Sequence, residues 1–276
     1  MSLQQYSNDI KNFYQEISSE RIDYNRIKGI TISIFGAGEK SGKSIIASNL
    51  AYVLSNNLKV LYFSSKKDGY INPLKTINFS DDIFGFVDTK FQNIKYLYFS
   101  PKSSFLSSEK MESMLLRLPN TVSENFNFFI HTVKNTFDFP DRYIILNNHI
   151  DIVVTEINSN MFSNVFQILE NLSFLPRAPK EIFILFNKCN SPFMAFEYYQ
   201  KLISQMTELK IPVKIYFLGN IPFDELRCRI SVTSNTILSE YFSDSPITGN
   251  FKFIAKRIIN YSYNLKKGEF MISVNK

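Results

Sequence analysis

The sequence predicts an α/β protein whose doubly wound, mostly parallel and twisted sheet is flanked by helices. Two observations carry this prediction. Short segments rich in β-branched and aromatic residues recur along the 276 residues, and several are apolar almost throughout. Such segments are typical of strands buried on both faces of a parallel sheet. Amphipathic helical patterns separate them, and alternation of strand and helix implies the βαβ crossovers from which doubly wound sheets are built.

Each expected element follows from its own pattern. Strands are expected, in chain order, over 30–35, 59–63, 95–99, 127–132, 151–155, 181–186 and 213–218. Helices are expected where apolar residues recur at helical spacing, as they do over 46–54, 111–118 and 162–169. Because no repeat or linker divides the chain, we expect one domain over 29–276, preceded by a helical extension over 1–28.

The composition excludes several classes of protein. Hydrophobic residues make up 45% of the chain, which argues against wholesale disorder. Cys189 and Cys228 lie far apart, so CxxC redox chemistry and iron–sulfur scaffolds are excluded and a reducing compartment is favoured. The net charge of +6 permits an anionic partner, but no basic cluster indicates sequence-specific nucleic-acid binding. With no signal-peptide pattern and no apolar run of membrane-spanning length, we expect a cytoplasmic protein.

The most informative segment is a glycine-rich loop over 36–44, with the sequence GAGEKSGKS. It directly follows an expected strand and leads into an expected helix, and it holds three of the nine glycines of the chain. Glycines let main-chain N–H groups converge on phosphate oxygens, and the helix N-terminus adds a positive dipole. The pattern resembles the phosphate-binding G-x-x-x-x-G-K-[ST] loop, although Ala37 occupies the position of its first glycine.

The polar groups of this loop have expected roles in binding a nucleotide. Lys43 would reach the β- and γ-phosphates, and the hydroxyl of Ser44 would bind Mg²⁺. The alternative is a glycine turn that precedes a helix by chance. The residues expected to surround ATP or ADP in this part of the chain are Gly36, Gly38, Glu39, Lys40, Ser41, Gly42, Lys43, Ser44 and Ile45.

The loop and the segments after it resemble the MinD/ParA superfamily of deviant Walker-A P-loop ATPases, whose loop reads GKGGxGK[ST]. NFNFFIHT falls where the family has Y-D-Y-I-I-I-D-T, FILFNKCN resembles its adenine-contacting strand end, and LGNIPFDE matches its G-x-I-P-x-D. The resemblance implies that Asn187 lies against the base and that Pro222 borders the nucleotide. Within the superfamily, the length and the extension before the first strand most resemble the MinD-like flagellar regulator FlhG.

The chain departs from the family pattern at positions that the family uses for catalysis. Gly38 stands where the family has a lysine that crosses a dimer interface. Ser64 and Lys66 stand where it has two aspartates, and His131 stands at its switch II aspartate, although a buried, hydrogen-bonded histidine is the favoured interpretation there. The resemblance therefore implies nucleotide binding with weak or absent hydrolysis. A register slip of about two to four residues would instead make Asp68 the catalytic aspartate.

The resemblance also implies a partner and a process. MinD-like proteins regulate flagellar or division-site placement through protein partners, and a homodimer is compatible with that role. A basic amphipathic helix is expected over 251–267. Peripheral contact with the inner membrane is one interpretation of this helix, and a terminal helix packed on the sheet is the favoured one. Two alternative functions stay open: an active ATPase of the superfamily with an unusual site, and a scaffold that has kept only the fold.

Overall fold

The computed structural model describes residues 22–64, 70–71, 84–99, 118–134, 141–175 and 182–267. Within these residues, eight strands form one sheet in the order β3-β4-β2-β5-β1-β6-β7-β8, and only β3 runs antiparallel to its neighbour. The strands are β1 (Ile30–Gly36), β2 (Val60–Ser64), β3 (Phe84–Asp88), β4 (Ile94–Phe99), β5 (Phe128–Thr132), β6 (Ile150–Glu156), β7 (Ile182–Asn187) and β8 (Ile215–Asn220).

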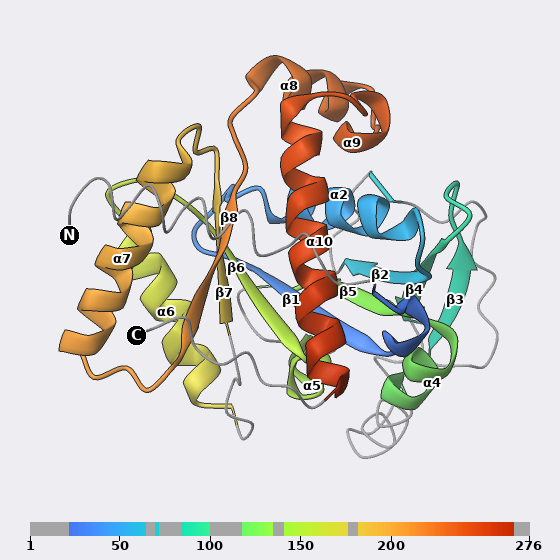
Figure 1. The fold of residues 1–276 in the computed structure, drawn as a ribbon, viewed down its shortest axis with the longest axis horizontal. Helices are drawn as coiled ribbons and strands as arrows, with labels where there is room; N and C mark the ends of the chain where they lie inside the picture. The colour runs from blue at the N-terminus through green and yellow to red at the C-terminus, as the bar shows by residue number, and fades with distance from the viewer. Residues whose placement is uncertain are drawn as a thin grey trace.

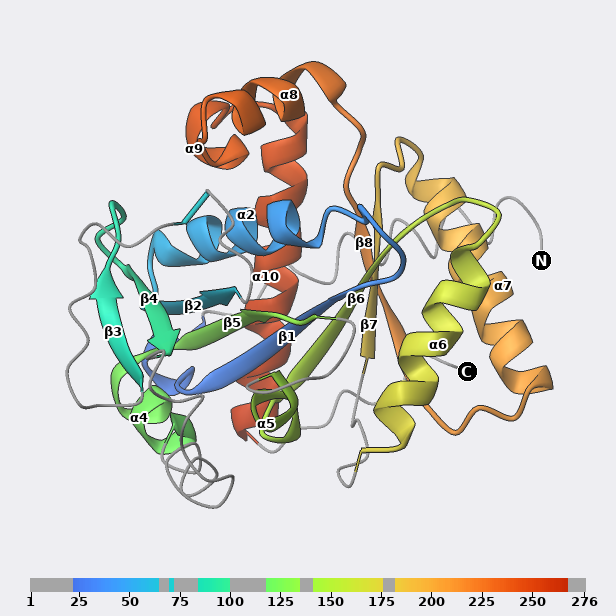
Figure 2. The same cartoon turned by 180° about the vertical axis from the view of Figure 1, so that it is seen from behind.

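Helices cover both faces of the sheet (Figures 1 and 2). On one face lie α2 (Lys43–Ser55) and α10 (Pro246–Lys267), which crosses the middle of Figure 1. On the other face lie α4 (Leu118–Asn125), α5 (Asp141–Leu146), α6 (Met161–Ser173) and α7 (Pro192–Glu208). Beyond one end of α10 lie α8 (Glu225–Thr233) and α9 (Leu238–Tyr241), and a single turn of 3-10 helix, η1 (Tyr24–Arg26), precedes β1.

The core is divided by the sheet into two apolar layers because successive side chains of a strand point to opposite faces. Ile30, Ile32 and Ile34 of β1 belong to the cluster packed with α2 and α10. Phe35 belongs to the cluster under α6 and α7, while Phe129 of β5 belongs to the cluster under α4 and α5. The central strands are buried along their whole length, as the parallel sheet requires.

The fold predicted from the sequence is confirmed, including all seven predicted strands, whose ends differ by at most two residues. The predicted helices over 46–54 and 162–169 lie within α2 and α6. Most of the third predicted helix, residues 111–117, lies outside the described residues. Residues 1–21 of the predicted N-terminal extension also lie outside them, and in the described part of the extension, 22–28, the helical structure is η1 alone. The strand β3 was missed, since it is a five-residue, half-buried edge that contains Gly85.

The terminal helix α10 begins at Pro246, five residues before its predicted start. The apolar stripe expected on this helix consists of Phe251, Ile254, Ile258, Tyr261 and Leu265. The first four are at most 8% exposed and belong to the same cluster as α2, and Leu265 is partly buried against that cluster. The favoured interpretation, a helix packed on the sheet, is therefore confirmed. The stripe is already buried within the protein itself.

Candidate functional site

The glycine-rich loop joins the carboxyl end of β1 to the N-terminus of α2. The amide of Ala37 donates to the carbonyl of Val154 in β6 (2.8 Å), which fixes the start of the loop on the neighbouring strand. Gly42 directly precedes α2 in a left-handed conformation (φ 82°) and supplies no side-chain cap. The first turn of α2 therefore presents its amide groups and the positive end of the helix dipole at the carboxyl edge of the sheet.

At three positions of the loop, neighbouring side chains lie too close to leave room for a Cβ atom, so these positions favour glycine. A Cβ atom at Gly36 would overlap the hydroxyl of Ser41, and one at Gly42 would overlap the amide nitrogen of Asn187. At Gly38 (φ 95°), a Cβ atom would lie 2.8 Å from Nδ2 of Asn164. A curled main chain with glycine at these points is what close approach to a phosphate group requires, so the loop residues fit a phosphate ligand.

Two residues at the end of β7 donate hydrogen bonds to carbonyls of the loop. Asn187, which is 8% exposed, donates through Nδ2 to the carbonyl of Ser41 (2.8 Å). Its neighbour Lys188 donates to the carbonyl of Lys40 (3.4 Å) and forms an ion pair with Glu156 of β6 (2.6 Å). Lys40 and Lys188 both have positive φ angles, 59° and 54°. Such a conformation costs about 1–3 kcal/mol in a residue with a side chain and persists where surrounding bonds impose it.

The lysine that directly follows Gly42 is directed toward β5. Lys43 Nζ donates to the carbonyl of Val133, one residue beyond the end of that strand. Ser44 and Ile45 follow in the first turn of α2, and both are partly buried. Ile45 has an apolar side chain, so only its main-chain amide can serve a phosphate group. The ammonium group of Lys43 lies between the phosphate loop and the polar residues at the end of β5.

A polar hollow of about 340 Å³ opens beside the loop, on its β6 side. It is lined by four residues of the loop, by Glu156 at the end of β6 and by three asparagines. The residues lining it are Ala37, Gly38, Glu39, Ser41, Glu156, Asn158, Asn160 and Asn164. In open α/β sheets, ligands bind in crevices at the carboxyl ends of the strands, and this hollow is in that place.

Two hydroxyl groups stand at the ends of β2 and β5. Thr132 Oγ1 donates to Ser64 Oγ (2.9 Å), and both side chains are buried. Tyr96 of β4 donates to the carbonyl of Ser64 (3.0 Å). Ser64 therefore has a structural partner at the point where the resemblance placed an aspartate.

His131 lies one residue before Thr132 and is fully buried. Its Nε2 lies 3.0 Å from Oδ1 of Asp141, its Nδ1 lies 3.5 Å from Ser33 Oγ, and its ring stacks on Phe63 with centroids 5.4 Å apart. Burial lowers the pKa of His131, and the nearby charge of Lys43 also lowers it, against the raising effect of Asp141. A neutral imidazole that is hydrogen-bonded and stacked is the environment that the sequence favoured for this residue.

The structure brings most of the predicted nucleotide residues to one edge. The loop over 36–45 and Asn187 are in direct contact, whereas Lys66 and Asp68 lie outside the described residues. Pro222 lies in the segment after β8, where the amide of Ile221 donates to Phe186 (2.8 Å) and the amide of Cys189 donates to Ile221 (3.0 Å). The segments after β7 and β8 therefore form one continuous rim beside the loop.

Three residues of this edge were missed by the sequence analysis. Glu156 is the last residue of β6, and its position after an apolar strand was a usable signal for a site at the carboxyl edge. Lys188 was overlooked because its neighbour Asn187 carried the resemblance. Asp141 had no usable signal, because an aspartate at the start of a short helix reads as a solvated residue and this one is 1% exposed.

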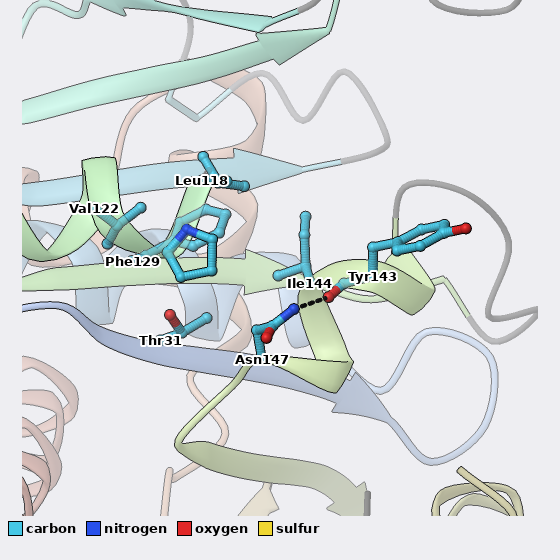
Figure 3. Close-up of a pocket in the computed structure, with 8 residues that line it drawn as sticks. Thr31, Leu118, Val122, Phe129, Tyr143, Ile144 and Asn147 are labelled. Carbon is cyan, nitrogen blue, oxygen red and sulfur yellow. Dashed lines mark hydrogen bonds between the residues drawn. The ribbon is translucent and has the colours of Figure 1, made fainter. Parts of the chain in front are cut away.

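A second cavity has a different character. Figure 3 shows it between α4 and α5, lined mainly by apolar side chains around Phe129 of β5. Within it, Asn147 Nδ2 donates to the carbonyl of Tyr143 (3.1 Å). Its volume of about 20 Å³ has room for about one water molecule, and it shares no lining residue with the polar hollow. It is a packing gap, too small for a nucleotide.

Two further properties bear on ligands and membranes. Within the ranges that the structure describes, no set of three histidine, cysteine, aspartate or glutamate side chains is arranged to hold a metal ion. Among the helices of those same ranges, none has the length and apolar character needed to cross a bilayer.

Comparison with known proteins finds a similarity in structure alone. No family model and no curated protein sequence matches the chain. Its fold is similar to a ParA family ATPase from Chlorobium tepidum TLS, with a TM-score of 0.61 and 14% identity over 87% of this chain and 99% of that one.

Two structures that contain MinD extend the likeness. A chain of the MinC:MinD cell division protein complex of Aquifex aeolicus has a TM-score of 0.59 and 10% identity, over 84% of this chain and 96% of that one. The septum site-determining protein MinD of Pyrococcus horikoshii OT3, complexed with Mg-ADP, has a TM-score of 0.58 and 15% identity, over 83% and 95%. At these identities the comparisons establish the fold, which is that of the MinD/ParA P-loop proteins.

Proposed function

We propose that this protein binds ATP or ADP in the loop over 36–45 and acts as a regulator through a protein partner, with weak or absent hydrolysis. The observation that carries the proposal is the glycine-dependent loop at the N-terminus of α2, with Lys43 beside it and Asn187 beneath it. Main-chain amides, a helix dipole and an ammonium group together bind polyphosphates. The Pyrococcus horikoshii structure of the same fold holds Mg-ADP, which supports this ligand class.

The proposal of defective hydrolysis rests on residues in the loop and opposite it. Phosphoryl transfer depends on groups that hold Mg²⁺, orient water and stabilise spreading charge. Ser64 and His131 supply a hydroxyl and a neutral imidazole at two of the positions in question, and Gly38 supplies no side chain at a third. Ser44 is the residue that would bind Mg²⁺, through its hydroxyl in the first turn of α2. The alternative is an active ATPase in which Asp68 has the catalytic role.

The regulatory role and the partner are inferred from resemblance. The MinC:MinD complex shows that a protein of this fold assembles with a second protein. We propose that this chain acts in the same manner in flagellar or division-site placement, as the likeness to FlhG in length and extension indicates. A homodimer is part of this proposal. Since α10 buries its apolar stripe, a role at the membrane would need another contact surface.

The experiment is thermal unfolding with and without ligand. At about 100 times its Kd, a ligand that binds only the folded state stabilises it by about 2.7 kcal/mol, which raises the melting temperature measurably. We expect millimolar ATP and ADP to stabilise the protein, and Lys43→Ala to lose the effect. Lys201→Ala, on the exposed surface of α7, is the matched control and should keep it. If neither nucleotide shifts the melting temperature of the unmodified protein, the scaffold alternative is correct.

A further inference from the structure

The main chain just beyond β5 is held from two sides. On one side, the carbonyl of Val133 accepts a hydrogen bond from Lys43 Nζ. On the other, the amide of Lys134 donates to Oδ2 of Asp141 (2.6 Å), whose Oδ1 faces His131 Nε2 at 3.0 Å. A single buried carboxylate therefore joins the end of β5 to α5, and the peptide between Val133 and Lys134 lies between this carboxylate and the phosphate-loop lysine.

We propose that Asp141, held by His131, is a positioning residue for Lys43: it fixes the Val133–Lys134 peptide so that the Val133 carbonyl holds the ammonium group in one place between the phosphate loop and the end of β5. This inference rests on the proposed nucleotide binding and adds to it a pair of residues that no part of the phosphate-loop pattern contains. Neither residue touches the ligand in this account; they act through Lys43.

The chemistry of the carboxylate explains why this position suits aspartate. An ionised carboxylate accepts hydrogen bonds at both oxygens, and here one oxygen serves the imidazole and the other serves the Lys134 amide. Such charge-assisted bonds are about twice as strong as neutral ones. Asparagine has the same size but only one acceptor oxygen, so Asp141→Asn can keep one of the two bonds and must release or invert the other.

The imidazole of His131 is the second member of this pair of residues. His131 is enclosed by Asp141 from α5, Ser33 from β1, Phe63 from β2 and the charge of Lys43 from α2. Burial holds its pKa below the ordinary value, so at neutral pH it is uncharged and donates through Nε2 to the carboxylate. The negative charge of Asp141 is then left to balance the positive charge of Lys43 across the Val133–Lys134 peptide.

A positioned lysine binds phosphate better than a mobile one. A free lysine side chain carries about 2 kcal/mol of rotamer entropy, which binding must overcome. An ammonium group has three N–H donors, so Lys43 can keep the Val133 carbonyl while it donates to a phosphate oxygen. If the Val133 carbonyl is no longer held in place, the protein should bind ligands that reach Lys43 more weakly and bind other ligands with unchanged affinity.

The test compares ADP with AMP, because the phosphate-loop lysine reaches the β-phosphate that AMP lacks. Calorimetry on the full chain should show that Asp141→Asn weakens ADP binding about tenfold and changes AMP binding less than about twofold. Asp151→Asn is the matched control, since Asp151 is a buried aspartate on β6 that accepts from Asn148. This control variant should leave the ratio of the ADP affinity to the AMP affinity unchanged.

A second variant guards against misfolding. His131→Gln keeps the Lys134–Asp141 bond and should also reduce the affinity for ADP relative to that for AMP, by about threefold. Thermal unfolding without ligand verifies that each variant is folded. An equal loss for ADP and AMP would make Asp141 purely structural and overturn the inference, and so would an unchanged ADP affinity. If the unmodified protein binds neither nucleotide, the proposed function itself fails.

Discussion

The carboxyl edge of the sheet is built differently on its two sides. Beside β6 and β7, main-chain carbonyls of the phosphate loop are held by Asn187 and Lys188, and the loop borders a polar hollow of about 340 Å³. Beside β2 and β5, side chains satisfy one another: Thr132 donates to Ser64, and His131 pairs with Asp141. The first side surrounds a polar hollow, and the second pairs its polar side chains with one another inside the protein.

This difference separates two tasks that a nucleotide site performs. Phosphate binding by a loop depends mainly on main-chain amides and one lysine, so it tolerates drift in the other side chains. Hydrolysis depends on side chains that hold metal and orient water, so it is lost when those side chains change. The contrast between the two sides is therefore the structural basis of the proposal that binding is kept and turnover is weak or absent.

The largest expected effect concerns turnover. In GTPases, one group that stabilises the transition state of phosphoryl transfer increases the rate by about 10³–10⁵-fold. Because this site lacks several such groups, its catalytic constant should be well below about one turnover per minute. We expect phosphate release by the purified protein to equal that of Lys43→Ala. Release clearly above this blank, and lost on Asp68→Ala, would show that Asp68 is catalytic and that the two sides do not divide the tasks.

The next effect concerns the loop itself. Gly42→Val adds a side chain at φ 82° that would overlap Nδ2 of Asn187, so we expect ADP affinity to fall at least about 100-fold and stability to fall by about 1–3 kcal/mol. Gly249→Ala is the control, because nothing lies within 4 Å of a Cβ atom at this position of α10. It should raise stability by about 0.5–1 kcal/mol and leave binding unchanged.

The phosphate loop could be predicted because its determinants are local. Gly36, Gly42 and Lys43 lie within eight residues of one another, and the flanking strand and helix have strong patterns. The central strands were predictable for the same reason, since burial on both faces leaves an uninterrupted apolar segment. The edge strand β3 has no such segment: its residues are half-buried or exposed, and a Cβ atom at Gly85 would overlap the ring of Tyr98 in β4.

The rest of the site depends on packing between distant segments. Lys188 meets Lys40 across 148 residues, and Lys43 meets Val133 across 90. Because these contacts are set by which strands lie next to each other, no spacing rule reveals them. The role suggested for Asn187 shows the same limit: the resemblance placed it against a base, and the structure adds a bond to the loop carbonyl of Ser41.

The side beside β5 should respond to pH through His131. The pKa of this residue is lowered by burial in the folded protein, so the unfolded chain binds the proton more readily. Stability should therefore be full above the ordinary histidine value of 6.5 and should fall as the pH decreases below it.

His131→Phe keeps a ring against Phe63 and removes the titrating group, so its melting temperature should be lower at neutral pH but should decline less between about pH 7 and pH 5. His149→Phe removes the other of the two histidines and is the control, which should retain the part of the decline that His131 causes. An equal decline in all three proteins would assign the pH dependence to other groups.

The smallest effect concerns the side beside β7. Lys188→Met removes the bond to the Lys40 carbonyl and the ion pair with Glu156, while the loop keeps its bond from Asn187. The Lys188 side chain is 38% exposed, and ion pairs of this kind contribute about 0–1 kcal/mol, so we expect ADP affinity to fall no more than about fivefold. Lys201→Met breaks an ion pair of similar length with Glu197 (2.7 Å), far from the loop, and should leave affinity unchanged.

Titrations at low and high salt separate two causes: a loss that shrinks with salt reflects the charge of Lys188, whereas a constant loss reflects its hydrogen bond to the loop. If Lys188→Met weakens ADP as much as Gly42→Val does, the loop depends on the lysine and not on its own glycines, and the division between main-chain binding and side-chain catalysis is wrong.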